Sequence, residues 1–193
     1  MGQVEGEVRH EELDPEREAR RRAALVQVRQ YPDPVLRLAA KDVEGFDESV
    51  QALVERMTAI MREARGVGLA APQIGILRRV LVYQTGEDDS LVALVNPRVL
   101  GSSDETEVGD EGCLSLGMAT VVVEVERPVS VRVEALSPRG EPLQVEAEGL
   151  EARVIQHELD HLDGILTIDR TSDASRRAAL AQLRPHPVLG PLG

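Results

Sequence analysis

The sequence predicts an α+β domain in which antiparallel β-sheets surround one central helix. Its 193 residues suit a single domain, on the usual scale of about 100–200 residues per domain. Hydrophobic residues make up 42% of the chain and charged residues 29%, which is typical of a globular protein and excludes collagen, coiled coil and complete disorder. Two strong helical patterns stand on either side of several short strand patterns, and this order indicates an α+β arrangement.

The chain begins with a charged segment, which we predict to be an N-terminal extension covering residues 1–23. Residues 1–22 contain no apolar stripe, so we expect a solvated extension or a short polar helix, with an adaptor role for its arginine cluster as the alternative. A core-like segment from Ala24 to Arg37 follows, in which Pro32 and Pro34 force turns or extended chain.

The segment from Asp47 to Arg65 has the clearest helical pattern in this half of the chain. Asp47 or Ser49 can cap the start of this helix, and Gly66 and Gly68 can end it. The residues that follow, as far as Gly75, are so rich in Gly and Ala that we expect a loop whose backbone comes close to another group. The pattern is that of a core helix, because apolar residues recur at helical spacing: Val50, Leu53, Val54, Met57, Ile60, Met61 and Ala64.

The middle of the chain is predicted to be mostly strand. Residues 101–112 are polar and acidic, and we expect them to form an exposed loop. Turns are expected at 86–90 and 137–140. Five segments have the composition or the alternation of strands: Ile76–Tyr83, Leu91–Val95, Thr120–Glu126, Val129–Leu136 and Pro142–Ala147.

Two further helices are predicted towards the C-terminus. The first runs from Leu150 to Asp163 and is stopped by Gly164. The second is short and runs from Asp173 to Leu183. The last nine residues contain three prolines and two glycines, so we expect a flexible tail over 185–193.

The charge and composition exclude several classes of function. The net charge of −12 disfavours nucleic-acid binding, because an acidic chain repels phosphate backbones, and we expect no DNA partner. One Phe, two Tyr and no Trp leave little aromatic surface for stacking on bases. No run of 18 apolar residues is present, so we expect no membrane partner. The chain starts without a secretory signal, and its one Cys cannot form an intramolecular disulfide, so we expect a cytoplasmic protein.

The sharpest functional signal is an H-E-x-x-H motif inside the helix predicted from Leu150. The spacing of His157 and His161 puts both imidazoles on one helix face, one turn apart, where they can bind one divalent metal ion. Glu158 follows the first histidine, where it is placed to take a proton from a water on the metal. The helical phase places both histidines on the buried side, which argues against unrelated surface residues.

Two ligands are too few for a catalytic metal, because such sites use three protein ligands and leave one position for water. The pattern alone leaves the third ligand open. Upstream, the lone Cys113 would more often be a small buried hydrophobe, although its flanking glycine and the acidic loop before it make a ligand more plausible. Downstream, the candidates are Asp163, Asp169, Asp173 and His186.

Three segments taken together resemble the peptide deformylase family. They are Gly-Val-Gly-Leu-Ala-Ala-Pro-Gln at 66–73, Glu-Gly-Cys-Leu-Ser at 111–115 and Gln-His-Glu-Leu-Asp-His-Leu at 156–162, in the order in which the family has its three signature motifs. The resemblance runs from about Val26 to about Thr171, three quarters of the chain. It implies a peptide deformylase-like catalytic domain, to which we assign residues 24–184, and hydrolysis of the formyl group from formylmethionyl peptides of newly made proteins.

The resemblance also implies a role for individual residues. Cys113, His157 and His161 correspond to the metal ligands, and Glu158 to the general acid/base. In the same correspondence Gln73 donates its side-chain amide, and Leu114 its backbone N–H, to the formyl oxygen. The backbone of Gly68 contacts the substrate, and Val67 lines the methionine pocket.

The family resemblance favours Fe(II) as the metal, while a Cys-His-His ligand set also suits Zn(II), Ni(II) or Co(II). The expected partners are N-formylmethionyl peptides and nascent chains. The short C-terminal helix and the net charge of −12 give no support to ribosome contact. After Ser115 the chain departs from the family pattern, because residues 116–123 lack the usual Ser-x-Pro continuation, and the sequence leaves the effect on substrate binding open.

Two alternatives remain at this point. An H-E-x-x-H endopeptidase would need a downstream third ligand and an extended cleft, and it leaves Cys113 and Gln73 unexplained. A divergent paralogue would keep the metal site but have altered or absent deformylase activity, and the unusual stretch 116–123 motivates this reading.

Overall fold

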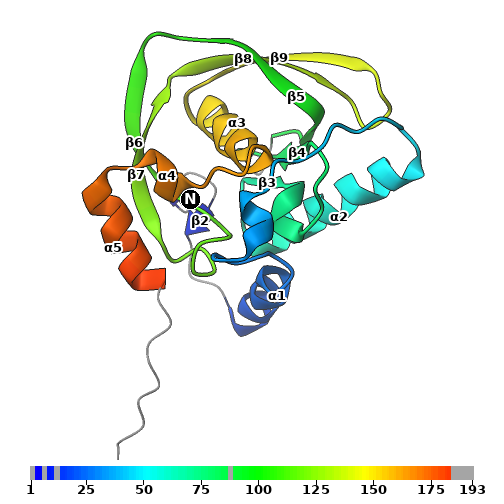
Figure 1. The fold of residues 1–193 in the computed structure, drawn as a ribbon. Helices are drawn as coiled ribbons and strands as arrows, with labels where there is room; N and C mark the ends of the chain where they lie inside the picture. Colours follow the sequence, from blue (N-terminus) through cyan, green and yellow to red (C-terminus); the bar gives the residue numbers. More distant parts are fainter. Residues whose placement is uncertain (1–2, 6–7, 11–13, 87–88, 184–193) are drawn as a thin grey trace, which may run out of the picture.

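The computed structural model describes residues 3–5, 8–10, 14–86 and 89–183. It confirms the predicted α+β fold, with one helix, α3 (Gly149–Leu162), between antiparallel sheets (Figure 1). A five-stranded sheet curves over α3, and its strand order is β3-β4-β5-β8-β9. Its strands are β3 (Gly68–Ala70), β4 (Val80–Tyr83), β5 (Val92–Ser102), β8 (Ser130–Leu136) and β9 (Pro142–Glu148).

Two smaller antiparallel sheets complete the strand content of the described residues. One pairs β6 (Thr106–Gly112) with β7 (Val122–Pro128), beside α3. The other is an N-terminal hairpin of β1 (Gln3–Glu5) and β2 (Val8–His10). The β6–β7 pair matters most for function, because Cys113 directly follows β6.

The prediction of an exposed loop over 101–112 is wrong. β5 extends to Ser102, and β6 pairs with β7 in an unbroken register from Thr106 opposite Pro128 to Gly112 opposite Val122. Most side chains of β6 are exposed and polar. The strand is held by its backbone hydrogen bonds to β7 and not by an apolar face that packs on the core. The sequence therefore lacks the alternation by which strands are recognised.

Helix α2 (Glu48–Ala64) lies almost where the periodicity predicts it. The Asp47 side chain caps it by accepting a hydrogen bond from the Ser49 N–H at 2.9 Å. At the C-terminal end, Arg65 has a left-handed backbone, with φ of 62°, and caps the helix. The helix therefore ends one residue before the position at which Gly66 is predicted to end it. The glycine-rich segment that follows is only partly loop, since it contains β3 and the 3₁₀ helix η2 (Ala71–Ile74).

Helix α1 (Pro15–Leu25) begins inside the segment predicted as an extension and ends two residues beyond it. The Asp14 side chain caps it by accepting from the N–H groups of Glu16 and Arg17. Its last residues, Ala24 and Leu25, are buried in the same apolar cluster as α2. This helix therefore runs across residue 23, where the sequence predicts the end of the extension. The division of the chain into an extension and a catalytic domain stays a prediction.

The remaining elements are short. The prolines near the start of the core give a 3₁₀ helix, η1 (Pro34–Arg37). A single-turn helix, α4 (Thr167–Arg170), which the sequence analysis missed, precedes α5 (Asp173–Leu183). The predicted tail at 185–193 lies outside the described residues.

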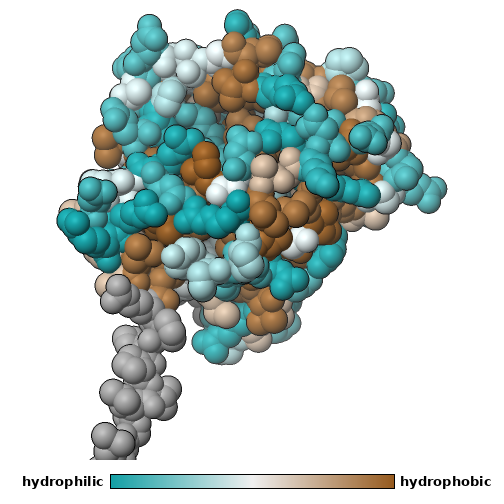
Figure 2. Space-filling model, viewed as in Figure 1, coloured by the Kyte–Doolittle hydropathy of each residue, from teal (hydrophilic) through white to brown (hydrophobic). Residues whose placement is uncertain are grey.

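Three apolar clusters hold the layers together. One packs α1 and α2 against one side of β4, and a second packs α3 against the five-stranded sheet. The third lies around Cys113, where β7, η1, α4 and α5 meet. Among the described residues, no helix is long and apolar enough to cross a membrane. On the face seen in Figure 2, hydrophilic residues cover most of the surface, with apolar residues in smaller groups between them.

Candidate active site

Three potential metal ligands meet at the centre of the molecule. Helix α3 places His157 and His161 one turn apart, with their ring centroids 5.0 Å from each other. The chain leaving β6 brings Cys113 against them, with its Sγ 3.3 Å from Nε2 of His161. The ligand atoms of all three residues lie within 4.8 Å of one another, and all three side chains are buried.

The downstream candidates for the third ligand are placed elsewhere. Asp163 pairs with Arg79, at 2.6 Å, and Asp169 pairs with Arg37. Asp173 begins α5, and His186 lies outside the described residues. Cys113 therefore resolves the choice that the sequence pattern left open.

The donor set fits a transition metal. A buried thiolate and two imidazoles are soft and borderline donors of the kind that hold Zn(II) or Fe(II), and three protein ligands leave a position for water. Burial alone would raise the pKa of Glu111, but hydrogen bonds from Arg127 and His157 outweigh it and hold this pKa well below its ordinary value. Because a carboxylate can only accept, His157 donates from Nδ1 to Glu111 Oε2, at 3.0 Å, so Nε2 is the nitrogen of that ring that can act as the metal ligand.

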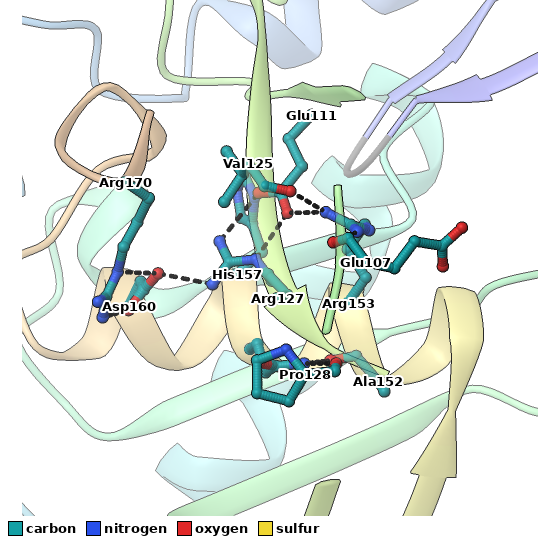
Figure 3. A network of polar contacts seen from close by, with 11 residues as sticks. Glu107, Glu111, Val125, Arg127, Pro128, Ala152, Arg153, His157, Asp160 and Arg170 are labelled. Atoms are coloured by element: carbon teal, nitrogen blue, oxygen red, sulfur yellow. Dashed lines mark hydrogen bonds and ion pairs between the residues drawn. The ribbon is translucent and has the colours of Figure 1, made fainter. Parts of the chain in front are cut away.

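Glu111 is itself held by a buried network of charges, which Figure 3 shows. Arg127 on β7 donates from Nε and Nη2 to the two oxygens of Glu111, at 2.6 and 2.9 Å. Arg153 on α3 donates to Glu111 Oε1, at 2.9 Å, and also to the backbone carbonyls of Val125 and Glu107. The network thus ties the β6–β7 sheet to the helix that carries the histidines.

The same network reaches the other end of the motif. Arg127 also donates from Nη1 to Asp160 Oδ2, at 2.9 Å, and Arg170 donates to both oxygens of Asp160. The sequence analysis missed Glu111, Arg127 and Arg170 as site residues, although Glu111 lies inside the second motif. The β6–β7 pairing, which the analysis did not predict, puts Arg127 opposite Glu107, and the hydrogen bonds of its side chain show that it reaches Glu111 and Asp160.

Glu158 lies against the glycine-rich segment. Its side chain is fully buried, and a Cβ added at Gly68 would lie 2.3 Å from Oε1 and 2.9 Å from Cδ of Glu158. The sequence predicts that the backbone of this segment comes close to another group. The structure shows this at Gly68, whose backbone lies against the Glu158 side chain.

Gln73 and Leu114 lie next to the ligand sulfur. The Gln73 side chain accepts from the Ala70 N–H through Oε1, at 2.7 Å, and this turns its amide group towards Cys113. Gln73 Nε2 is 3.9 Å from Cys113 Sγ and 3.3 Å from Ser115 Oγ. Leu114 is fully buried directly after the cysteine. Val67 is also fully buried, in the cluster between α3 and the five-stranded sheet, so its role as a pocket wall remains a prediction.

Comparisons with known proteins agree with this geometry. A model of the polypeptide deformylase family matches residues 25–177. The peptide deformylase of Natranaerobius thermophilus is 48% identical over 153 residues, which cover 79% of this chain and 96% of that protein. The crystal structure of a peptide deformylase from Legionella pneumophila is similar, with a TM-score of 0.76 and 41% identity over 81% of this chain and 91% of that one.

The crystal structure of the peptide deformylase from Thermotoga maritima has a TM-score of 0.72 and 48% identity, over 75% of this chain and 96% of that one. The matched region, residues 25–177, contains all three sequence segments and all three potential metal ligands. The chain belongs to the peptide deformylase family, and it is a metal-binding hydrolase with peptide deformylase activity.

Proposed function

We propose that the chain removes the formyl group from N-formylmethionyl ends of nascent chains and peptides, with Cys113, His157 and His161 holding the metal and Glu158 moving the proton. The observation that carries this assignment is the buried meeting of the three ligand atoms, with Gln73 against the ligand sulfur and Glu158 buried next to His157 on α3. A divalent ion held there lowers the pKa of water and so supplies hydroxide near neutral pH.

Glu158 supplies general acid–base catalysis in this proposal. Its carboxylate accepts a proton from the attacking water and passes it to the amine nitrogen that leaves, so that formate and a free N-terminus result. Burial favours this role, because the side chain is fully enclosed and Gly68 leaves just enough room for its carboxylate.

Gln73 and Leu114 supply the oxyanion stabilisation. Negative charge develops on the formyl oxygen during attack, and the Gln73 amide and the Leu114 N–H are the proposed donors to it. One such donor in a dry site typically contributes about 3–4 kcal/mol to the transition state. The support in this chain is that both residues are fully buried and adjoin Cys113.

Fe(II) is our proposal for the working metal, with Zn(II), Ni(II) or Co(II) as substitutes that the same donors accept. We also place the activity in the cytoplasm. The chain's one cysteine supports this, because a reducing compartment keeps its thiol available as a metal ligand.

Gly68→Ala is expected to lower kcat roughly 100-fold, because the new methyl group would displace the Glu158 carboxylate and a misplacement of about 1 Å can cost that much. Formate release measured on metal-loaded protein checks this. Gly45→Ala is the matched control, since a Cβ there meets nothing within 4 Å. Normal kcat in the Gly68 variant would contradict the assigned contact.

Substrate choice tests the proposed reaction itself. The chain is expected to deformylate formyl-Met-Ala-Ser at least about 100-fold faster than it deacetylates acetyl-Met-Ala-Ser, because the extra methyl group must enter a site whose walls are fully buried. Formate and acetate release from the two peptides are compared on one sample. Equal rates, or cleavage between Met and Ala, would refute the proposal.

A further inference from the structure

The stretch that departs from the family pattern contains an unusual backbone. Gly117, Met118 and Ala119 have φ values of 60°, 56° and 67°, so three successive residues are left-handed. Glycine adopts this region freely, but Met and Ala are strained in it and stay there only when their surroundings hold them. One restraint is local, because Thr120 Oγ1 donates to the Gly117 carbonyl at 2.7 Å.

The second restraint comes from Gln30, which is far away in sequence. Its Oε1 accepts the Met118 N–H at 2.8 Å, so the strained residue is held from outside the loop. Its Nε2 donates to the Leu114 carbonyl at 2.9 Å and to that of Val28 at 3.3 Å. One half-buried carboxamide therefore joins the unusual loop to the residue after the metal-ligand cysteine.

The neighbours of Gln30 contact the same region through their backbones. The Arg29 N–H donates to the Gln73 carbonyl at 2.7 Å, and the Tyr31 N–H donates to the Ser115 carbonyl at 2.9 Å. Residues 29–31 thus bind next to both proposed oxyanion donors. Gln30 does so through side-chain hydrogen bonds, which makes its contribution open to mutation.

The orientation of the Leu114 N–H depends on the peptides on both sides of that residue. The preceding peptide is fixed by the Leu116 N–H, which donates to the Cys113 carbonyl at 3.0 Å. The following peptide is fixed by Gln30. An oxyanion donor must point at the position that the charge will occupy, so loss of either restraint lowers the rate without removing the donor.

We propose that Gln30 is a positioning residue for deformylation, which fixes the Leu114 backbone and the loop 117–119 so that the Leu114 N–H is aimed at the formyl oxygen. This inference rests on the proposed role of Leu114.

Two variants of nearly the same size test the proposal. Gln30→Met loses all three hydrogen bonds, and Gln30→Glu can still accept from Met118 but places a carboxylate against the Leu114 carbonyl. Both are expected to lower kcat about tenfold or more, with KM within about twofold and metal content unchanged. Gln27→Ala, at an exposed position just after α1, is the matched control and should behave as the unmodified chain.

Readouts other than turnover separate positioning from a merely structural role. The visible absorption of the Co(II)-loaded variants should equal that of the Co(II)-loaded unmodified chain, because the ligands are untouched. A kcat equal to that of Gln27→Ala in either variant would overturn the proposal. A fall in kcat that is fully explained by a lower metal content or a lower melting temperature would overturn it as well. If the unmodified, metal-loaded chain released no formate, the proposed function would fail instead.

Discussion

Glu158→Gln is expected to lower kcat for formate release about 10³-fold or more, while the chain still binds its metal. The amide has the size of the carboxylate and fits the same fully buried position, but it cannot accept the proton of the attacking water. The metal ligands are unchanged, so only the proton transfer is lost. Steady-state kinetics and metal analysis on the same preparation give both quantities.

The control for this variant lies on the same helix. Glu151→Gln removes a carboxylate two turns earlier, where Oε1 accepts the Tyr83 hydroxyl at 2.8 Å, and an amide oxygen can accept it equally. That variant should keep the unmodified kcat. Near-normal turnover by Glu158→Gln would remove Glu158 from the role of general acid/base.

Cys113→Ser is expected to weaken metal binding at least about 100-fold. Changing a residue that only hydrogen-bonds to a metal ligand typically costs roughly 10–100-fold in affinity, and loss of the ligand itself should cost more. The hydroxyl stays largely protonated and is a harder donor than a thiolate, so a soft or borderline metal loses its anionic ligand. Competition with a chelator of known affinity measures the change.

Glu158→Gln serves as the control for metal affinity, because it keeps Cys113, His157 and His161. The serine variant should also lose formate release in proportion to lost metal, and excess metal should restore part of it. Unchanged affinity in Cys113→Ser would show that the sulfur is not a ligand, and it would reopen the choice of the third one.

Local patterns were sufficient to predict the helices α2 and α3 and the pair of histidine ligands. The periodicity of α2 and its Asp47 cap lie within one segment, and so does the spacing of His157 and His161 on α3. Cys113 required more, because its flanking glycine and the acidic segment before it favour a ligand but do not separate it from a buried thiol. Its assignment came from the order of three segments and is confirmed by their meeting in space.

What could not be predicted depends on pairing between distant segments. β6 has an exposed polar surface, so its strand character appears only when β7 is placed beside it. The contact of Arg127 with Glu111 forms only once β7 is paired with β6, and the contact of Gln30 with Leu114 joins residues 84 positions apart. No composition or periodicity within a short window contains such information.

The most direct test of the whole account is one anaerobic preparation in which metal content and formate release from formyl-Met-Ala-Ser are measured together. The account predicts one divalent metal ion per chain, rapid formate release, loss of both on chelation and recovery of both with Fe(II). Stoichiometric metal without formate release would contradict it and would point to the stretch 116–123 as the first place to look.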